Sequence, residues 1–550
     1  MSRGIMFVFL LVSSMGFAQQ ATEKLPRPKL VVGIMVDQMR WDYLYRYYDR
    51  YQPNGFKRML KEGFACENTM IDYVPTVTGI GHSTVYTGSV PAIHGITANN
   101  FYINATGQPI NCVSDSTVQT VGSSSNAGKT SPRNLLATTI TDELKLATNF
   151  RSKVIGIALK SNAAILPAGH LADAAYWFDG TSGNMITSTY YMNELPKWAQ
   201  EFNAKKLPEK YLKQNWNTLY DLNAYVQSLS DDNPYEEKSS GQEKSVFPVN
   251  TSGMIGKNFS ILPETPFGNT YTLDMARAAI ENEKLGEGGQ TDFLALSFSA
   301  TDGVGHKKGI NAVEIEDIYL RLDKDLASFL TYLDNKIGKG NYTLFLTADH
   351  GAGHNARFLM DRKAPAGIWK GEEALAELNA LLEKKYHVAN LTMHARSPQL
   401  FLNHPLILKN HLNSDSIKQD CIRFLKPQPG VAFVVDMDRV GETALPEEIK
   451  TRIINGYNPH RSGAIQVILA PGWQFGALEP GWRSGTVGTS HGAWNPYDAH
   501  IPAIFMGWGI KQGRTVRQTH MTDIAPTLAS LLRVQMPNGT IGKAIPEALK

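Results

Sequence analysis

Cysteine is scarce in this chain, with three residues in 550. Cys66, Cys112 and Cys421 are far apart, so none has the close spacing of a zinc site built from thiolates. The odd number allows one disulfide and one free thiol, and the sequence alone does not fix the pair. We favour a bridge between Cys66 and Cys112, because both flank the glycine-rich segment 75–83 discussed below. Three unpaired, buried thiols are the alternative.

A strong net charge is also missing. Lysine and arginine number 54 against 51 aspartates and glutamates, which gives a net charge of +3. No basic cluster with interleaved aromatic residues is present, so nucleic acid is not expected as a stable partner. The 42% hydrophobic and 19% charged content is that of an ordinary globular protein, long enough for one large α/β domain with insertions.

Long hydrophobic runs are confined to the start of the chain. Arg3 precedes the apolar stretch 5–12, and small residues at Gly16 and Ala18 suit a cleavage site. We therefore predict a signal peptide over residues 1–18 and a mature chain, 19–550, that is periplasmic or secreted. The apolar run is short for a membrane anchor of about 20 residues. No cysteine follows the cut, which argues against a lipid anchor, and no membrane association is expected.

Three short, continuous apolar runs, 30–36, 293–298 and 344–348, lead into Asp37, Asp302 and Asp349. Such runs are typical of buried parallel strands, and they alternate with amphipathic helical patterns. This order predicts an α/β fold with a doubly wound, mostly parallel sheet. Further strands are expected at 154–159, 464–469 and 501–506, and helices at 272–285, 315–333 and 524–532.

Two regions interrupt the alternation of strands and helices. Residues 177–266 are rich in Tyr, Trp, Asn and Lys, and residues 358–461 contain a separate helix and extra apolar runs. We expect both to be insertions packed beside the sheet edge of one domain, 19–550, rather than separate domains. No internal repeat is evident.

The aspartates at the strand ends have histidines nearby. His306 follows Asp302 by four residues, His350 follows Asp349 directly, and His491 lies further on. Because open α/β sheets carry their functional groups beyond the carboxyl ends of the strands, these side chains should converge. Three aspartates and three histidines suffice for two metal ions with three protein ligands each, and oxygen and imidazole ligands suit Zn²⁺, with manganese or cobalt as substitutes. Four other histidines near these segments are expected in packing or supporting roles: His82, His94, His354 and His500.

The segment 75–83 combines hydroxyl groups with flexible glycines before a short helical stretch. The Thr78 hydroxyl could simply cap that helix. Alternatively, the helix start presents the Thr78 oxygen and backbone N–H groups to an anion, and a metal ion makes the hydroxyl a nucleophile. Thr76 is the rival hydroxyl.

A series of motifs in this order resembles the alkaline phosphatase superfamily, and within it the phosphate-irrepressible periplasmic phosphatases of bacteria that use a threonine nucleophile. The motifs cover most of the mature chain and surround Asp37, Thr78, Asn99, Asp302 with His306, Asp349 with His350, and His491. The resemblance implies two zinc ions, one held by Asp302, His306 and His491 and the other by Asp37, Asp349 and His350 with Thr78. It also implies that Asn99 donates a hydrogen bond to a phosphoryl oxygen.

One segment departs from the pattern of these relatives. The monoesterases that this chain resembles carry Lys-Ser-Arg here, whereas this chain has Lys160 followed by Asn162 in place of the arginine. Lys160 favours dianionic monoesters, but Asn162 offers a neutral hydrogen bond instead of a bidentate cation. We predict an alkaline phosphatase of broad specificity with retained but weakened activity on small phosphate monoesters, acting as a monomer through a phosphothreonine.

Two other functions remain open. A phosphodiesterase or nucleotide pyrophosphatase on the same scaffold is suggested by Asn162 and by four aromatic residues that could stack a base: Tyr176, Trp177, Tyr190 and Tyr191. A non-catalytic metal- or phosphate-binding protein is the second alternative, although neither a ligand nor the nucleophile is missing. A sulfatase is disfavoured, because Thr78 stands where those enzymes carry Cys or Ser.

Overall fold

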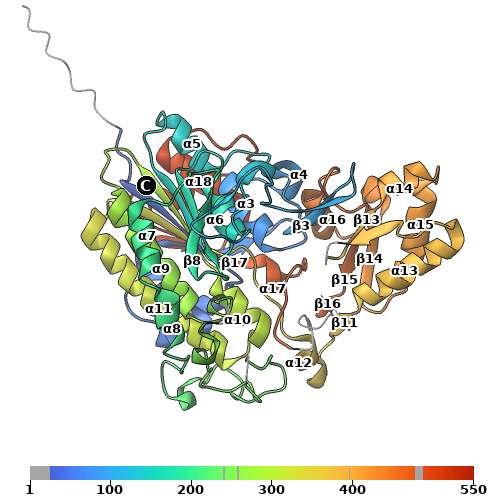
Figure 1. Cartoon of the computed structure of the whole chain (residues 1–550), viewed down its shortest axis with the longest axis horizontal. Helices are drawn as coiled ribbons and strands as arrows, with labels where there is room; N and C mark the ends of the chain where they lie inside the picture. The colour runs from blue at the N-terminus through green and yellow to red at the C-terminus, as the bar shows by residue number, and fades with distance from the viewer. Residues whose placement is uncertain (1–24, 240–241, 257–258, 395–396, 477–486) are drawn as a thin grey trace, which may run out of the picture.

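A computed structural model describes residues 25–239, 242–256, 259–394, 397–476 and 487–550 (Figure 1). The predicted signal peptide, 1–18, lies outside these residues. In the described part of the chain, no helix combines the length and the apolar composition that a membrane span requires.

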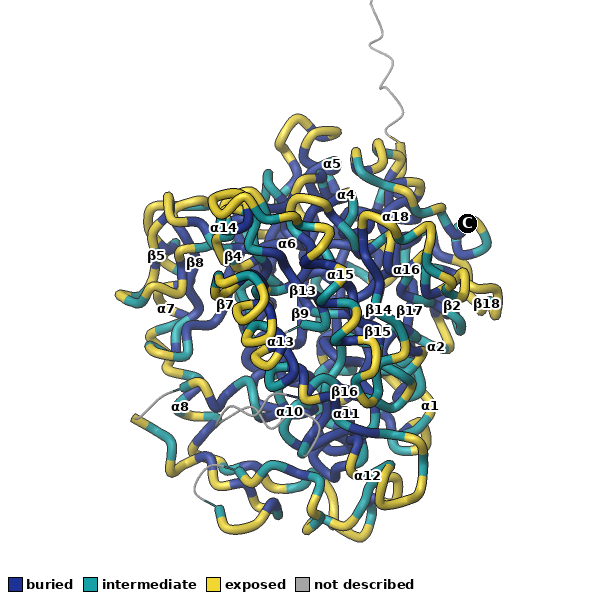
Figure 2. The backbone as a smooth tube through the Cα atoms, turned by 90° about the vertical axis from the view of Figure 1, so that its right-hand side faces the viewer, coloured by how far each residue is buried: buried dark blue, intermediate teal, exposed yellow. Residues whose placement is uncertain are grey.

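The large sheet has eleven strands, and its centre is parallel. Strand β1 (Leu30–Val36) pairs in parallel with β10 (Tyr342–Thr347) on one side and with β9 (Asp292–Phe298) on the other. Strand β6 (Val154–Ala158) continues the parallel order next to β9. All four strands are buried along their whole length, as their apolar runs predict (Figure 2). Their carboxyl ends therefore meet at one edge.

Antiparallel strands extend the sheet on both sides. On one side, β17 (His500–Gly507) pairs antiparallel with β10 and with β2 (Phe64–Met70). On the other side, β7 (Ala174–Asp179) is parallel to β6 and is followed by the antiparallel β8 (Asn184–Ser188). The order is β18-β2-β17-β10-β1-β9-β6-β7-β8-β5, with β19 beside β2. The three short strands named here for the first time are β5 (Thr120–Val121), β18 (Gly513–Thr515) and β19 (Thr519–His520).

Helices cover both faces of this sheet, as expected for a doubly wound fold (Figure 1). Helices α9 (Phe267–Glu283) and α11 (Val313–Leu333) lie on one face. Helices α3 (Thr78–Thr87), α6 (Ser161–Ala168) and α18 (Ile524–Leu532) lie on the other. The predicted α/β class with a mostly parallel sheet is confirmed.

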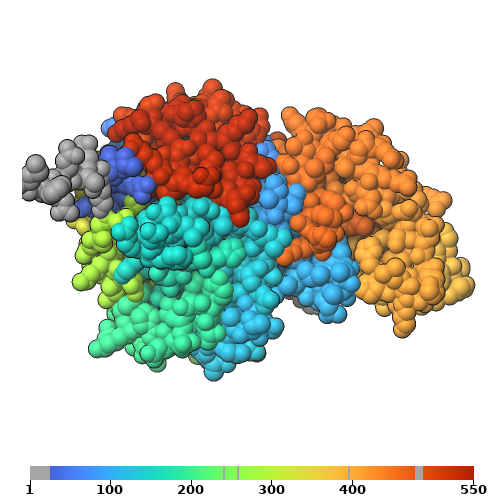
Figure 3. Space-filling view, turned by 90° about the horizontal axis from the view of Figure 1, so that it is seen from above, coloured from blue at the N-terminus to red at the C-terminus, as the bar shows by residue number. Residues whose placement is uncertain are grey.

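A second, four-stranded antiparallel sheet lies beside the first, in the order β12-β13-β15-β14. Its strands are β12 (Thr392–His394), β13 (Gln399–Leu402), β15 (Ile465–Leu469) and β14 (Val431–Asp436). Helices α13 (Gly371–Tyr386) and α15 (Ser414–Leu425) pack on it around their own apolar cluster. We call residues 367–475 the small lobe, drawn in orange in Figure 3. The predicted strand at 464–469 thus belongs to the small lobe and not to the large sheet.

The boundary at residue 177 falls inside β7 of the large sheet, because Trp177 and Phe178 are strand residues. The chain beyond β8 forms α7 (Lys197–Ala204), α8 (Leu207–Leu212) and mostly irregular structure up to α9.

The predicted Cys66–Cys112 bridge is wrong, since all three cysteines are buried and unpaired. Cys66 lies within β2, where it pairs with Ala503 of β17. Cys112 instead packs close to Gly79, at the start of α3. Burial raises the pKa of the Cys112 thiol to about 12, so it stays protonated and unreactive.

Candidate active site

The predicted site residues follow neighbouring parallel strands. Asp37 comes directly after β1. Asp349 is the second residue after β10, and Lys160 is the second residue after β6. Asp302 lies in the first turn of α10 (Ala300–Lys308), which follows β9. The three aspartates are 3% exposed or less. The sheet order therefore brings together side chains that are up to 312 residues apart in the sequence, a span set by Asp37 and Asp349.

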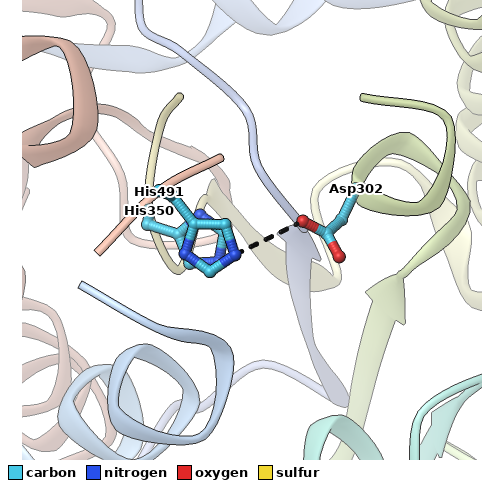
Figure 4. A group of neighbouring side chains, drawn as sticks. All are labelled: Asp302, His350 and His491. Atoms are coloured by element: carbon cyan, nitrogen blue, oxygen red, sulfur yellow. Dashed lines mark ion pairs between the residues drawn. The ribbon is translucent and has the colours of Figure 1, made fainter. Parts of the chain in front are cut away.

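Carboxylates and imidazoles form two groups whose ligand atoms all lie within 4.8 Å of one another. One group is Asp37, Asp349 and His350, with the His350 Nε2 atom 3.6 Å from Asp37 Oδ1 and 3.4 Å from Asp349 Oδ2. The other is Asp302, His350 and His491, with His491 Nε2 3.7 Å from Asp302 Oδ1 (Figure 4).

The sequence assigned His350 to one group only, but the structure places it in both. The rings of His350 and His491 stack with centroids 3.5 Å apart and planes 13° apart. His306 reaches the second group through Asp302, since its Nε2 atom lies 3.2 Å from Asp302 Oδ1. All six predicted carboxylate and imidazole ligands are therefore contiguous.

The orientation of the imidazoles fits metal ligation. The Nδ1 atoms of His306, His350 and His491 each lie 2.7–3.1 Å from a backbone carbonyl oxygen, so Nδ1 carries the proton. Each Nε2 lone pair then faces the carboxylates, the arrangement seen in metal-ligating histidines. Asp37 Oδ1, Asp349 Oδ2 and His350 Nε2 are buried without a hydrogen-bond partner. Such atoms are costly unless a cation meets them, so the residues fit a metal with oxygen and nitrogen ligands.

The electrostatics agree with this interpretation. Burial, together with Asp302 and Asp349, raises the pKa of Asp37 well above its ordinary value. Burial also raises the pKa of Asp349 to about 6 and lowers the pKa of His350 to about 3. Like charges repel across the cluster in a dry environment, and a bound cation would relieve that repulsion.

Lys160 is a cation that already faces this cluster. Its Nζ atom lies 2.7 Å from Asp37 Oδ2, 2.5 Å from Asp302 Oδ2 and 3.5 Å from Thr78 Oγ1. Burial alone would lower the pKa of Lys160, but Asp302 and Asp37 raise it above its ordinary value. Lys160 is therefore charged and borders both groups and the candidate nucleophile.

Thr78 does not cap the helix that it begins. Val77 holds the N-cap position of α3, and no side chain caps the helix there. Thr78 is 2% exposed and its hydroxyl faces Lys160. The rival hydroxyl of Thr76 is engaged elsewhere, because it donates to the Ala493 carbonyl and accepts from the Gly492 N–H. This bonding favours Thr78 as the nucleophile.

Asn99 and Asn162 lie beside the start of α3. The Asn99 Oδ1 atom accepts from the Gly79 N–H at 2.8 Å and from Asn162 Nδ2 at 3.3 Å. This use of its oxygen leaves the Asn99 amide hydrogens to donate. Asn162 supplies no charge, so Lys160 is the one lysine or arginine that borders the cavity among its described residues.

Sequence reasoning missed Gln38. Its backbone N–H donates to Asp349 Oδ1 at 3.1 Å, and its Nε2 donates to Asp302 Oδ1 at 2.6 Å. Gln38 thus joins the carboxylates of both groups. It does so from a left-handed backbone conformation with φ of 63°, and Gly305 leaves room for its amide. Neither feature can be read from a single glutamine in the sequence.

A cavity of about 290 Å³ opens above these residues, between the large sheet and the small lobe. Its floor contains Thr78, Asn99, Lys160 and His491. The four aromatic residues proposed to stack a base are not part of its described lining. Tyr176 and Trp177 are buried in β7, and Tyr190 packs edge-to-face on Tyr191. The cavity is lined instead by aromatic residues that the sequence did not single out: Trp473, Phe475, Trp494 and Tyr497.

Comparison with known proteins agrees with this geometry. Residues 31–494 match the model of the type I phosphodiesterase / nucleotide pyrophosphatase family. The chain is 56% identical to a protein of Myroides odoratus named calcium-transporting ATPase, over 97% of each chain. It is 51% identical to alkaline phosphatase PhoV of Synechococcus elongatus, over 95% of this chain and 93% of that protein.

Alkaline phosphatase PafA of Elizabethkingia meningoseptica is 48% identical over 98% of each chain. The crystal structure of wild-type PafA superposes with a TM-score of 0.92 and covers 96% of this chain and 100% of that one. The match to the family model and these identities over nearly the whole length leave one assignment. The chain belongs to the type I phosphodiesterase / nucleotide pyrophosphatase family of the alkaline phosphatase superfamily.

Proposed function

We propose that this protein is an alkaline phosphatase that hydrolyses phosphate monoesters through a phosphothreonine at Thr78. The observation that carries the proposal is the Thr78 hydroxyl, which has no capping role and lies 3.5 Å from Lys160 Nζ beside two carboxylate–imidazole groups. The relatives named alkaline phosphatases, PhoV and PafA, support the same reaction.

The two groups would hold two zinc ions. Asp37, Asp349 and His350 would bind one, and Asp302, His306 and His491 the other, with His350 at the border of both. Zinc supplies Lewis-acid stabilisation of charge on the attacking and departing oxygens.

The protein's own residues position the phosphoryl group for two in-line displacements. In the first, the Thr78 oxygen forms a bond to phosphorus, its proton passes to water, and the ester oxygen departs with the bonding electrons. In the second, a water oxygen forms a bond to phosphorus while the bond from phosphorus to the Thr78 oxygen breaks, so that phosphate is released and the Thr78 oxygen takes up a proton from water. Lys160 neutralises the phosphoryl oxygens, and the Asn99 amide donates to one of them.

Monoesters carry more negative charge on their phosphoryl oxygens than diesters do. Lys160, charged and placed among buried carboxylates, therefore favours monoesters. The competing function is a phosphodiesterase, and it is favoured by Asn162, which stands 3.3 Å from Asn99 without a charge. Export of the mature chain 19–550 to the periplasm or medium, and activity as a monomer, are parts of the proposal that rest on the sequence.

Trapping the covalent intermediate tests the proposal. Acid quenching of the zinc-loaded enzyme with phenyl phosphate should leave one phosphate on the peptide that contains Thr78, detected by mass spectrometry. Thr78→Ala should abolish both the adduct and turnover but retain zinc, whereas Thr76→Ala should still form the adduct. Full activity of Thr78→Ala would overturn the assignment.

A further inference from the structure

The outer wall of the active-site cavity differs from its floor. The acidic, lysine and histidine side chains among its described lining are Lys160, Asp302, His306, His491 and Asp498. The first four belong to the floor described above, and Asp498 is fully buried. The rest of the described wall, from 467–469, 473–475 and 492–497, carries no charge. A second phosphate or a carboxylate on the substrate therefore has no cationic partner among the described residues of this wall.

Aromatic rings form much of that wall. Trp473 and Phe475 come from β16 (Trp473–Phe475) of the small lobe, and Tyr497 comes from α17 (Pro496–Ala499), which faces it (Figure 1). Trp494 completes the set. All four are half-buried, so each keeps part of its surface open although it is packed.

Glycines allow the backbone to pack closely against two of these rings. A side chain at Gly430 would lie 1.9 Å from the Trp473 ring, and one at Gly371 would lie 2.3 Å from Phe475. Trp494 is oriented by a hydrogen bond from its indole N–H to the Leu469 carbonyl at 3.2 Å. The rings are thus held by close packing and by one hydrogen bond, which lowers the entropic cost of binding a ring against them.

We propose that this wall is the leaving-group subsite and that it selects monoesters of planar aromatic alcohols. The inference rests on the proposed function, because the cavity is continuous with the Thr78 floor. With the phosphoryl group on Lys160 and Asn99, the organic group of the ester points away from Thr78 and into the aromatic part of the cavity. Aromatic faces there would stack on a ring and gain little from a short alkyl group.

Binding of non-hydrolysable phosphonates tests this subsite without turnover. Benzylphosphonate is isosteric with phenyl phosphate, and methylphosphonate keeps only the anionic group. Calorimetry with the zinc-loaded protein should show benzylphosphonate binding about tenfold more tightly than methylphosphonate. Trp473→Ala should remove the preference for benzylphosphonate and leave the methylphosphonate affinity within about twofold of the parent protein's. Trp473→Phe should keep most of the preference, because it keeps an aromatic ring.

Two controls make the result decisive. Tyr190→Ala, which removes an aromatic ring outside the cavity, should keep the tenfold preference. Cyclohexylmethylphosphonate matches the size of benzylphosphonate without its flat face and should bind more weakly. Equal affinity for cyclohexylmethylphosphonate and benzylphosphonate would overturn the inference. So would a preference for benzylphosphonate over methylphosphonate that is unchanged in both Trp473→Ala and Phe475→Leu. Preserved binding without hydrolysis of phenyl or methyl phosphate would instead contradict the proposed function and leave the subsite standing.

Discussion

At the scale of the residue, the hydrogen bonds separate the roles of similar side chains. Thr76 and Thr78 are two residues apart, yet Thr76 uses its hydroxyl to fix the loop that carries His491, while Thr78 leaves its hydroxyl to the cavity. Asn99 and Asn162 also differ in their hydrogen bonds. The amide oxygen of Asn99 accepts from the Gly79 N–H and from the Asn162 amide, so Asn162 is the donor of the pair. These distinctions set which residue can react and which can only position.

Gln38 provides a residue-scale prediction. Its amide donates to Asp302, and loss of such a supporting hydrogen bond typically lowers metal affinity about 10–100-fold. Gln38→Ala should therefore weaken zinc binding by about that factor, measured by competition with a chromophoric chelator. Gln214→Ala, on the exposed surface, should bind zinc like the parent protein. An unaltered zinc affinity in Gln38→Ala would show that Asp302 is oriented without it.

At the scale of the element, the parallel strands decide where the chemistry sits. Strands β10, β1, β9 and β6 are neighbours in that order, and each one leads into a candidate site residue. Helix α3 then brings Thr78 against this edge. The approach is close, because a side chain on Gly81 would lie 2.4 Å from the Asp349 carbonyl oxygen. Gly81 thus allows the short distance between the helix and the candidate metal ligands.

Replacement of Gly81 tests that contact. Gly81→Ala should push α3 away from Asp349 and destabilise the fold by about 1–3 kcal/mol, as overpacking typically does. It should also lower kcat more than tenfold, because a displacement near 1 Å at the reacting groups can cost about 100-fold. Urea unfolding and steady-state kinetics measure the two effects. Gly288→Ala, which has open space for its side chain, should show neither, and a fully active Gly81→Ala would contradict this account of α3.

The sequence predicted the elements whose signal is local and repeated. Apolar runs ending in Asp37, Asp302 and Asp349 identified the central strands, and strand-end geometry predicted their convergence. The sequence did not reveal that the cysteines are unpaired, to which sheet residues 464–469 belong, or which residues form the cavity wall. Those depend on long-range packing: β15 has the same apolar pattern as a central strand, but its neighbours are β13 and β14. Gln38 and Trp473 likewise gain their roles from tertiary contacts alone.

At the scale of the whole molecule, two parts with separate cores share one cavity. The large sheet supplies the reactive floor, and the small lobe supplies much of the wall. The parts meet through α4 (Pro91–His94) and α16 (Glu447–Gly456), and Figure 3 shows the orange lobe set against the blue residues near position 100 of the colour bar. Metal binding should stabilise the part built on the large sheet, because the candidate ligands come from segments of it that are distant in the chain.

Zinc removal and a change of pH test this stabilisation. A ligand present at about 1,000 times its Kd stabilises the folded state by about 4 kcal/mol, so chelation should lower Tm and added zinc should restore it. Protons compete with zinc at Asp349, whose pKa burial raises to about 6, while His350, with a pKa of about 3, stays neutral. Zinc affinity should hence fall as the pH drops through about 6. A pH-independent affinity between pH 5 and 8, by calorimetry, would contradict this ligand assignment.

The ratio of kcat/KM for phenyl phosphate to that for methyl phenyl phosphate tests the central claim most directly. The two substrates share a leaving group and differ in the charge that Lys160 meets. A monoesterase should give a ratio well above 1 in the zinc-loaded enzyme, and Lys160→Ala should lower it about 10–100-fold by removing a charge-assisted hydrogen bond. A ratio below 1 that is indifferent to Lys160→Ala would make this protein a phosphodiesterase.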